Sequence, residues 1–161
     1  MAISDFRGGV RIPAASCATY PGGNKPPDTI VSAGGLAVFG SSNIALQSIC
    51  SVPVPEKALI RQFVIVGNVV KGLIRASLGG VLSNVPRQTT AYAELTMDAS
   101  TPYDVPDQKQ KKAVVNLPTT GPRRLVIDRS QTYVIEALFS APAAVSLEEA
   151  LELFYFEIYW D

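Results

Sequence analysis

The stretches Ala58-Leu-Ile-Arg-Gln-Phe-Val-Ile-Val66 and Leu151-Glu-Leu-Phe-Tyr-Phe-Glu-Ile-Tyr-Trp160 decide the fold. Both are short runs rich in β-branched and aromatic residues, and a strand places successive side chains on opposite faces. The first stretch is mostly apolar on both of its faces, which predicts a central strand buried on two sides. In the second stretch the alternation places Phe154, Phe156, Ile158 and Trp160 on one face, and Tyr155, Glu157 and Tyr159 on the other.

Prolines lie between such runs and almost never inside them. From residue 28 onward they occupy positions 53, 55, 86, 102, 106, 118, 122 and 142. Proline cannot donate to a sheet ladder, so it collects at strand ends and edges. The pattern predicts about nine strands without helical crossover segments, which favours an antiparallel all-β fold. We therefore predict a two-sheet sandwich, with the jelly roll ahead of an immunoglobulin-like arrangement.

One short helix is predicted near the end of the chain. Ser146-Leu-Glu-Glu149 fits a capping box, in which the serine and the second glutamate satisfy each other's free backbone groups. This motif predicts a helix from residue 147 to about residue 151.

The first 28 residues differ from the rest, because they are rich in glycine and proline and carry only scattered apolar residues. We interpret them as an extended arm that precedes a single sandwich domain spanning residues 29–161. The arm is either loose or ordered by a neighbouring subunit. The apolar residues of the arm, with the aromatic residues of the last strand, are the predicted interface: Phe6, Ile12, Tyr20, Tyr155, Tyr159 and Trp160.

Composition narrows the class of protein. The 161 residues are 47% hydrophobic and 17% charged, with a formal net charge of zero. The charged fraction is below the usual value of about 25%, which suggests that a partner covers part of the surface. Strong nucleic-acid binding normally needs a basic excess, so no direct nucleic-acid contact is expected. No apolar run approaches the length of a membrane span, and the first residues lack the apolar core of a signal peptide. We therefore expect a chain made in the cytoplasm and left unprocessed.

The chain has no histidine, which removes the commonest general base and the commonest zinc ligand. A non-enzymatic protein without a cofactor or metal is expected. The two cysteines, Cys17 and Cys50, could form a bridge if the first segment lies beside the second strand, but two buried thiols are the favoured interpretation.

Two polar clusters could each be a binding site or an ordinary solvated loop. Side chains whose oxygen atoms could bind calcium occur between residues 98 and 107, but their spacing matches no calcium loop, and a solvated loop is favoured. A basic cluster made of Lys109, Lys111 and Lys112, with Arg123 and Arg124 further along, could contact an anionic partner. A solvated loop is again the favoured interpretation.

The stretch Ser51-Val-Pro-Val-Pro-Glu-Lys-Ala-Leu-Ile-Arg-Gln-Phe-Val-Ile, followed by Ser-Gln-Thr-Tyr-Val-Ile-Glu-Ala at 130–137, resembles a pattern in β-sandwich proteins of bacteriophage and other virions. The resemblance implies a capsid, decoration or fibre subunit that self-assembles or docks on other virion proteins. The missing basic arm departs from the small RNA-virus coat proteins, which argues against direct genome binding.

Two alternatives stand beside the virion hypothesis. The first is a carbohydrate-binding sandwich, which would need aromatic side chains exposed on a flat face. The candidates for that role are Tyr92, Tyr103, Tyr133 and Trp160. The second is an enzyme that works with carboxylates alone, for which the chain shows no recognisable pair.

Overall fold

The computed structural model describes residues 6–22, 26–32, 34–82, 85–128 and 130–161. These residues form twelve strands and three short 3-10 helices. The strands are β1 (Gly8–Pro13), β2 (Ala18–Pro21), β3 (Asp28–Ser32), β4 (Gly35–Phe39), β5 (Ile44–Ser51), β6 (Ile60–Asn68), β7 (Leu73–Leu82), β8 (Val85–Asp98), β9 (Tyr103–Val105), β10 (Gln110–Asn116), β11 (Gln131–Ala141) and β12 (Leu151–Trp160). The helices are η2 (Ala14–Ser16), η3 (Pro106–Gln108) and η4 (Leu147–Glu149).

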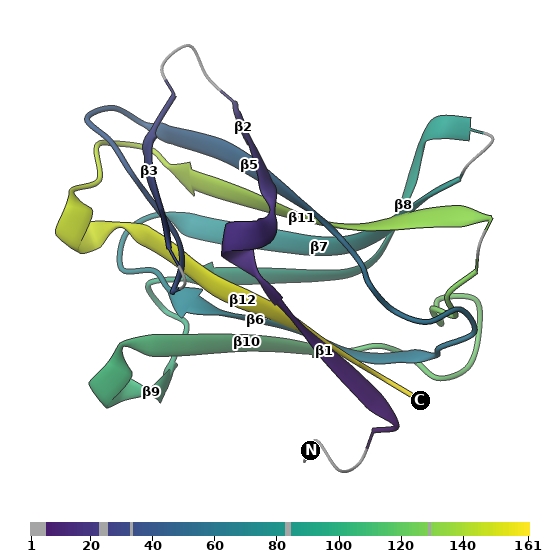
Figure 1. The fold of residues 1–161 in the computed structure, drawn as a ribbon. Coiled ribbons are helices and arrows are strands. Elements are labelled where there is room, and N and C mark those ends of the chain that lie inside the picture. Colours follow the sequence, from purple (N-terminus) through teal and green to yellow (C-terminus); the bar gives the residue numbers. More distant parts are fainter. Residues whose placement is uncertain (1–5, 23–25, 33, 83–84, 129) are drawn as a thin grey trace.

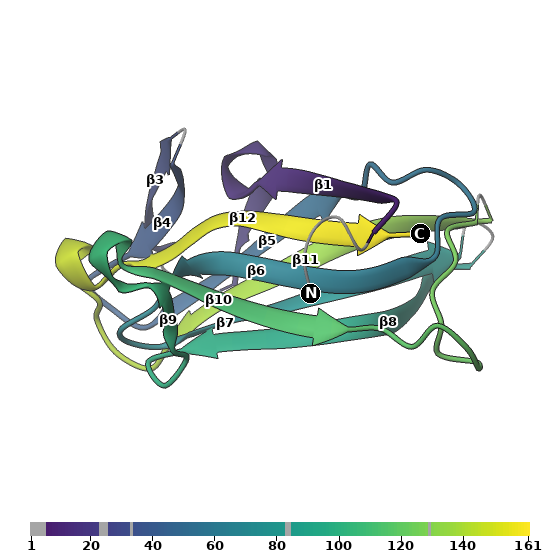
Figure 2. The same cartoon turned by 90° about the horizontal axis from the view of Figure 1, so that it is seen from below.

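The strands form two antiparallel sheets that pack face to face (Figures 1 and 2). The seven-stranded sheet has the order β3-β4-β12-β6-β10-β9, and β1 also pairs with β12. The five-stranded sheet has the order β2-β5-β11-β7-β8. The predicted all-β, jelly-roll type of sandwich is confirmed. Strand β6 lies between β12 and β10, in the central position predicted for it.

The main core fills the space between the sheets. Phe63 and Phe156 stack there with ring centroids 6.2 Å apart. The five-stranded sheet contributes Ile135 and Phe139, which are also fully buried. The alternation along β6 and β12 thus buries one face of each strand in the sandwich interior.

The first segment is built into the sandwich. Strand β1 pairs with β12, and β2 pairs with β5, so the predicted arm contributes an outer strand to each sheet. Cys17, which immediately precedes β2, forms a disulfide with Cys50 of β5, with the two Cα atoms 4.7 Å apart. The favoured interpretation of two thiols is therefore wrong. The condition for a bridge is met, because the first segment does lie beside the strand that carries Cys50.

Residues 28–39 form a hairpin of β3 and β4, and Gly35 takes a left-handed φ of 126° at its turn. The segment between residues 98 and 107, for which a solvated loop was favoured, contains β9 and the start of η3.

The predicted helix is confirmed as a single 3-10 turn, η4. The hydroxyl of Ser146 donates to Glu149 Oε1 at 2.9 Å. Hydrogen bonds from the side chain and the backbone of Ser146 lower the pKa of the Glu149 carboxyl group. None of the helices in the described part of the chain has the length and hydrophobicity needed to cross a membrane.

Candidate functional site

A β-bulge in β12 determines which side chains the seven-stranded sheet presents outward. Leu153 pairs with Gly67 and Tyr155 pairs with the next residue, Val66, so Phe154 is an extra residue without a partner. A bulge shifts the alternation by one position. Leu153 and Phe156 therefore both face the core, while Phe154 and Tyr155 belong to a second cluster on the outer face. The prediction that Phe154 shares the core face with Phe156 is wrong for this reason.

The bulge depends on the absence of a side chain at Gly67. A Cβ atom built there would lie 2.1 Å from the carbonyl oxygen of Glu152, far inside van der Waals contact. The glycine lets the backbone of β12 approach β6 closely at the point where the register changes.

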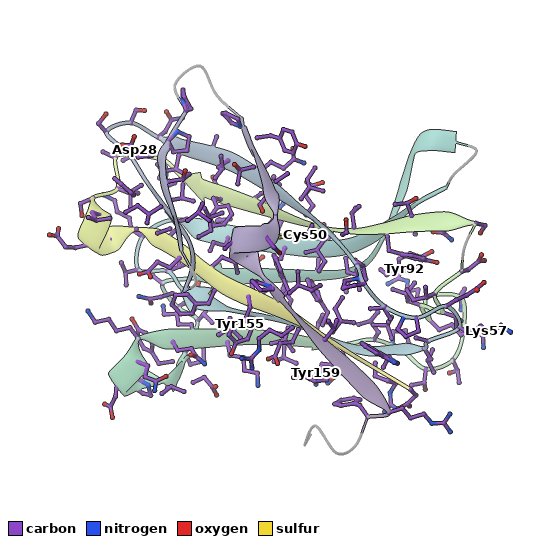
Figure 3. The ribbon with its side chains drawn as sticks, viewed as in Figure 1. Asp28, Cys50, Lys57, Tyr92, Tyr155 and Tyr159 are labelled. Carbon is purple, nitrogen blue, oxygen red and sulfur yellow. A yellow bond between two sulfur atoms is a disulfide. The ribbon has the colours of Figure 1, made fainter. Side chains whose placement is uncertain are left out.

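Aromatic side chains form one wall of the outer face. Phe6, just before β1, stacks on Tyr159 of β12 with ring centroids 5.0 Å apart. Val64 and Val66 of β6 lie in the same small apolar cluster, and Tyr155 packs against it. Figure 3 shows Tyr155 and Tyr159 following the line of β1 and β12, well away from Tyr92.

Charged groups are fixed against these rings. The guanidinium of Arg11, on β1, lies 3.9 Å from the centroid of the Tyr155 ring. It also donates to Glu157 Oε2 at 3.4 Å, and the Tyr159 hydroxyl donates to the same oxygen at 2.6 Å. Because Glu157 is 8% exposed and accepts both bonds, it holds the cation and the phenol in place.

Both phenols are protonated at neutral pH, and burial raises their pKa values further above the ordinary 10.0. The pKa of Tyr159 rises to about 12, first because the ring is desolvated and then because its hydroxyl donates to Glu157. Burial also raises the pKa of Tyr155, against the opposing effect of Arg11. The face therefore offers neutral hydroxyl groups that can exchange hydrogen bonds with a ligand.

These groups line a series of adjoining hollows on the outer face. The first, about 200 Å³, is lined by Phe6, Arg11, Tyr155 and Tyr159, and by Gln110 and Lys112 of β10. The second, about 390 Å³, shares Arg11, Gln110 and Tyr155 with the first. The third, about 330 Å³, shares Gly34 and Phe154 with the second and extends to Ile30 of β3. Together they form what we call the β12 groove, which crosses the sheet.

Amide side chains add hydrogen-bonding groups beside the groove. Gln62 of β6 donates to Asn116 Oδ1 of β10 at 2.9 Å. Gln62 and Gln110 both line the first hollow. A groove with aromatic walls and a few fixed polar groups is the usual form of a binding site for a small organic ligand.

The aromatic residues first considered for a carbohydrate site do not share a face. Tyr133 is buried, and its hydroxyl accepts the backbone N–H of Asp128. Trp160 packs against the main core under β1, where a Cβ atom at Gly8 would lie 2.5 Å from its ring. Tyr103 lies on the edge strand β9. Tyr92 lines a separate hollow of about 450 Å³ beside Pro122 and Arg123, and its hydroxyl donates to Gln131 Oε1 at 3.2 Å.

The residues predicted as an interface also separate. Tyr155, Tyr159 and Phe6 meet in the β12 groove. Ile12 is buried in the main core, and Trp160 packs against it, so the fold itself uses both side chains. Tyr20 lies on β2, at the edge of the other sheet, with 51% of its surface exposed. Phe154 and Arg11 were missed, because the first needs the bulge and the second needs the pairing of β1 with β12.

The candidate calcium loop already holds a cation from the chain itself. The buried ammonium of Lys111 donates to the carbonyl oxygens of Val69, Asp98 and Ala99 at 2.7, 3.0 and 3.1 Å. Burial lowers the pKa of Lys111, against the attraction of Asp98. The Asp98 carboxylate is engaged with the backbone and hydroxyl of Ser100. Within the described residues there is no cluster of three or more metal-binding side chains.

Lys111 is therefore a buried structural residue and not part of the solvated basic cluster in which the sequence placed it. Arg123 and Arg124 are exposed in the segment between β10 and β11. Lys112 is exposed on β10 and borders the β12 groove.

Several solved carbohydrate-binding modules share the fold of this chain. One solved structure that shares it is the family 11 module of the cellulosomal cellulase Lic26A-Cel5E of Clostridium thermocellum, with a TM-score of 0.54, 11% identity, and coverage of 96% of this chain and 95% of that one. The xylan-binding module CBM15 gives a TM-score of 0.52 at 11% identity, covering 95% and 96% of the two chains. The module TmCBM61, solved with β-1,4-galactotriose, gives 0.51 at 8% identity, covering 92% and 91%.

The chain has the fold of these modules. No family model matches the sequence, and no curated protein matches it. The expectation of a virion structural protein, whether capsid, decoration or fibre, is contradicted, because the structures that share the fold are carbohydrate-binding modules and not capsid proteins. These neighbours are binding modules rather than catalytic domains.

Proposed function

We propose that this protein is a non-catalytic carbohydrate-binding module that binds a glycan chain in the β12 groove. The observation that carries the proposal is the outer face of β12, where Phe154, Tyr155 and Tyr159, with Arg11 and Glu157 among them, line three adjoining hollows that share residues. A sugar ring has an apolar C–H face and a polar rim. Aromatic rings suit the first, and fixed donors and acceptors suit the second.

The groove favours an oligosaccharide over a single sugar. From Phe154 to Tyr159 the strand spans about 17 Å at the usual rise of a β-strand. Three hollows share lining residues along that length. Affinity should therefore rise with the number of sugar units until the groove is filled.

The charges of the groove favour a neutral glycan. Arg11 and Lys112 border the first hollow together with Asp104 and Glu157, and Glu152 lines the third hollow, so two cations stand against three anions. Arg11 is in direct contact with one of these anions, Glu157. An acidic polysaccharide would gain attraction from the two cations but would also face the three carboxylates.

Disulfides form and persist in oxidising environments and are rare in the reducing cytosol. The Cys17–Cys50 disulfide therefore fits a protein that works outside the cytosol. We therefore place the module in an oxidising environment, the setting in which polysaccharides are also met.

The test is a binding screen followed by calorimetry. Soluble xylan, β-1,4-galactan and mixed-linkage β-glucan are first compared by affinity gel electrophoresis, and oligosaccharides of the retarding polysaccharide are then titrated. Tyr155→Ala should weaken binding at least tenfold, because the ring lies in two of the hollows. Tyr20→Ala is the matched control, because this tyrosine is exposed on the other sheet.

Retained oligosaccharide affinity in a folded Tyr155→Ala protein would refute the site. Absence of binding across a broad glycan array would refute the function. Circular dichroism of each variant separates loss of binding from loss of fold.

A further inference from the structure

The second unusual surface of the molecule is the free edge of β3. This strand ends the seven-stranded sheet, and among the described residues no strand pairs with its outer side. Ile30 is 46% exposed and its neighbour Val31 is 58% exposed, although successive residues point to opposite faces. Both faces of the strand therefore carry an exposed β-branched side chain. Figure 2 shows the hairpin of β3 and β4 at the margin of the molecule, and Asp28 in Figure 3 marks the start of β3.

Edge strands normally carry features that prevent pairing, such as shortness, lysine, proline or a bulge. The other outer strands in the described part of the chain have them. Strand β1 ends in Pro13 and carries the charge of Arg11. Strand β9 has three residues and an irregular register. Strand β2 ends in Pro21, and the register of β8 shifts at two places. Strand β3 has a regular five-residue register, contains neither proline nor lysine, and carries only the single charge of Asp28.

We infer that the free edge of β3 pairs with the β3 of a second copy of this chain. An antiparallel pair of identical strands is related by a two-fold axis, so the contact is self-complementary and closed. Centred on Ile30, it sets Ile30 opposite Ile30 and Thr29 opposite Val31, which are β-branched cross-strand pairs. The two Asp28 residues then lie at opposite ends of the ladder.

Charge favours a second copy over a charged partner. The edge presents one carboxylate and no base, so it gives a strongly charged partner little to recognise. The whole chain has a formal net charge of zero, so two copies do not repel each other at long range.

The pairing has a consequence that rests on the proposed function. Residues directly opposite in an antiparallel ladder lie on the same face, so the outer faces of the two seven-stranded sheets point the same way. Ile30 lines the third hollow of the β12 groove, next to the two-fold axis. The dimer would therefore present two grooves to one polysaccharide chain, and avidity for long glycans would exceed affinity for short ones.

The experiment is sedimentation velocity without glycan, over a concentration range up to about 1 mM, because a five-residue ladder lies at the small end of specific interfaces. The wild-type protein should shift with concentration from the 17.2 kDa of one chain to twice that mass. Ile30→Lys should remain at 17.2 kDa throughout, because it places two like charges across the axis. Leu138→Lys is the matched control, since this residue is 38% exposed on a strand of the other sheet and should leave dimerisation unchanged.

A wild-type protein that stays monomeric, an Ile30→Lys protein that still dimerises, or open-ended assemblies beyond the dimer would each overturn the inference. The Tyr155→Ala variant keeps the two proposals separable. It should dimerise normally while losing glycan affinity, and a dimer without any glycan ligand would refute only the proposed function.

Discussion

Removal of the Cys17–Cys50 disulfide is the change whose effect on the free energy of unfolding follows most directly from the structure. The bridge closes a loop with a sequence separation of 33 residues. In the chain-entropy model, losing a closed loop of that length costs about 3.7 kcal/mol of stability at 25 °C. Because domains of this size are typically stable by 5 to 15 kcal/mol, as an order of magnitude, the loss should be plainly visible but should not abolish folding.

The assay is urea unfolding of the oxidised protein, the same protein in dithiothreitol, and Cys17→Ala/Cys50→Ala. With a slope of about 2 kcal/mol/M, the midpoint should fall by roughly 2 M. The slope should also rise, because the uncrosslinked chain exposes more surface when it unfolds. If the reduced protein and the double variant have the same midpoint, the loss of stability comes from the missing crosslink and not from the side-chain change at buried Cys50. Equal midpoints for oxidised and reduced protein, with the thiols shown to have reacted, would refute the loop-entropy argument.

Two more predictions concern buried polar groups. Lys111→Met should lower the free energy of unfolding by about 3 kcal/mol or more, because it leaves three carbonyl oxygens without their donor. Lys112→Met, at the exposed neighbouring position, should change the free energy of unfolding by less than about 0.5 kcal/mol. Chemical denaturation measures both, and equal effects would contradict the structural role of Lys111. Ultraviolet titration of tyrosinate should show one group ionising near pH 12 that is missing in Tyr159→Phe. Since the folded pKa of Tyr159 lies above the ordinary 10.0, its contribution to stability is complete below pH 10 and is lost as the pH rises through about 12. A titration in which Tyr159→Phe removes a group near pH 10 instead would contradict the buried hydrogen bond to Glu157.

The sequence predicts those parts of this fold that depend on local pattern. Proline spacing and two-residue alternation identify the sandwich and its central strand β6, and the capping box identifies η4. Long-range pairing has no such signal. The register between β1 and β12 joins residues about 150 positions apart, with Gly8 opposite Trp160, and it alone brings Arg11 to Tyr155. The disulfide was missed for the same reason, because its formation depends on β2 lying beside β5.

The extent of the proposed site follows from one irregular residue in β12. With uninterrupted alternation, Phe154 would point into the core beside Phe156, and the outer face would carry only Tyr155, Glu157 and Tyr159. The unpaired position of Phe154 turns its ring outward instead, where it lines both the second and the third hollow. The groove thereby continues from Tyr159 toward the free edge of β3. Gly67 permits this arrangement by leaving room for the Glu152 carbonyl, so the backbone geometry of β6 and the length of the binding face are set together.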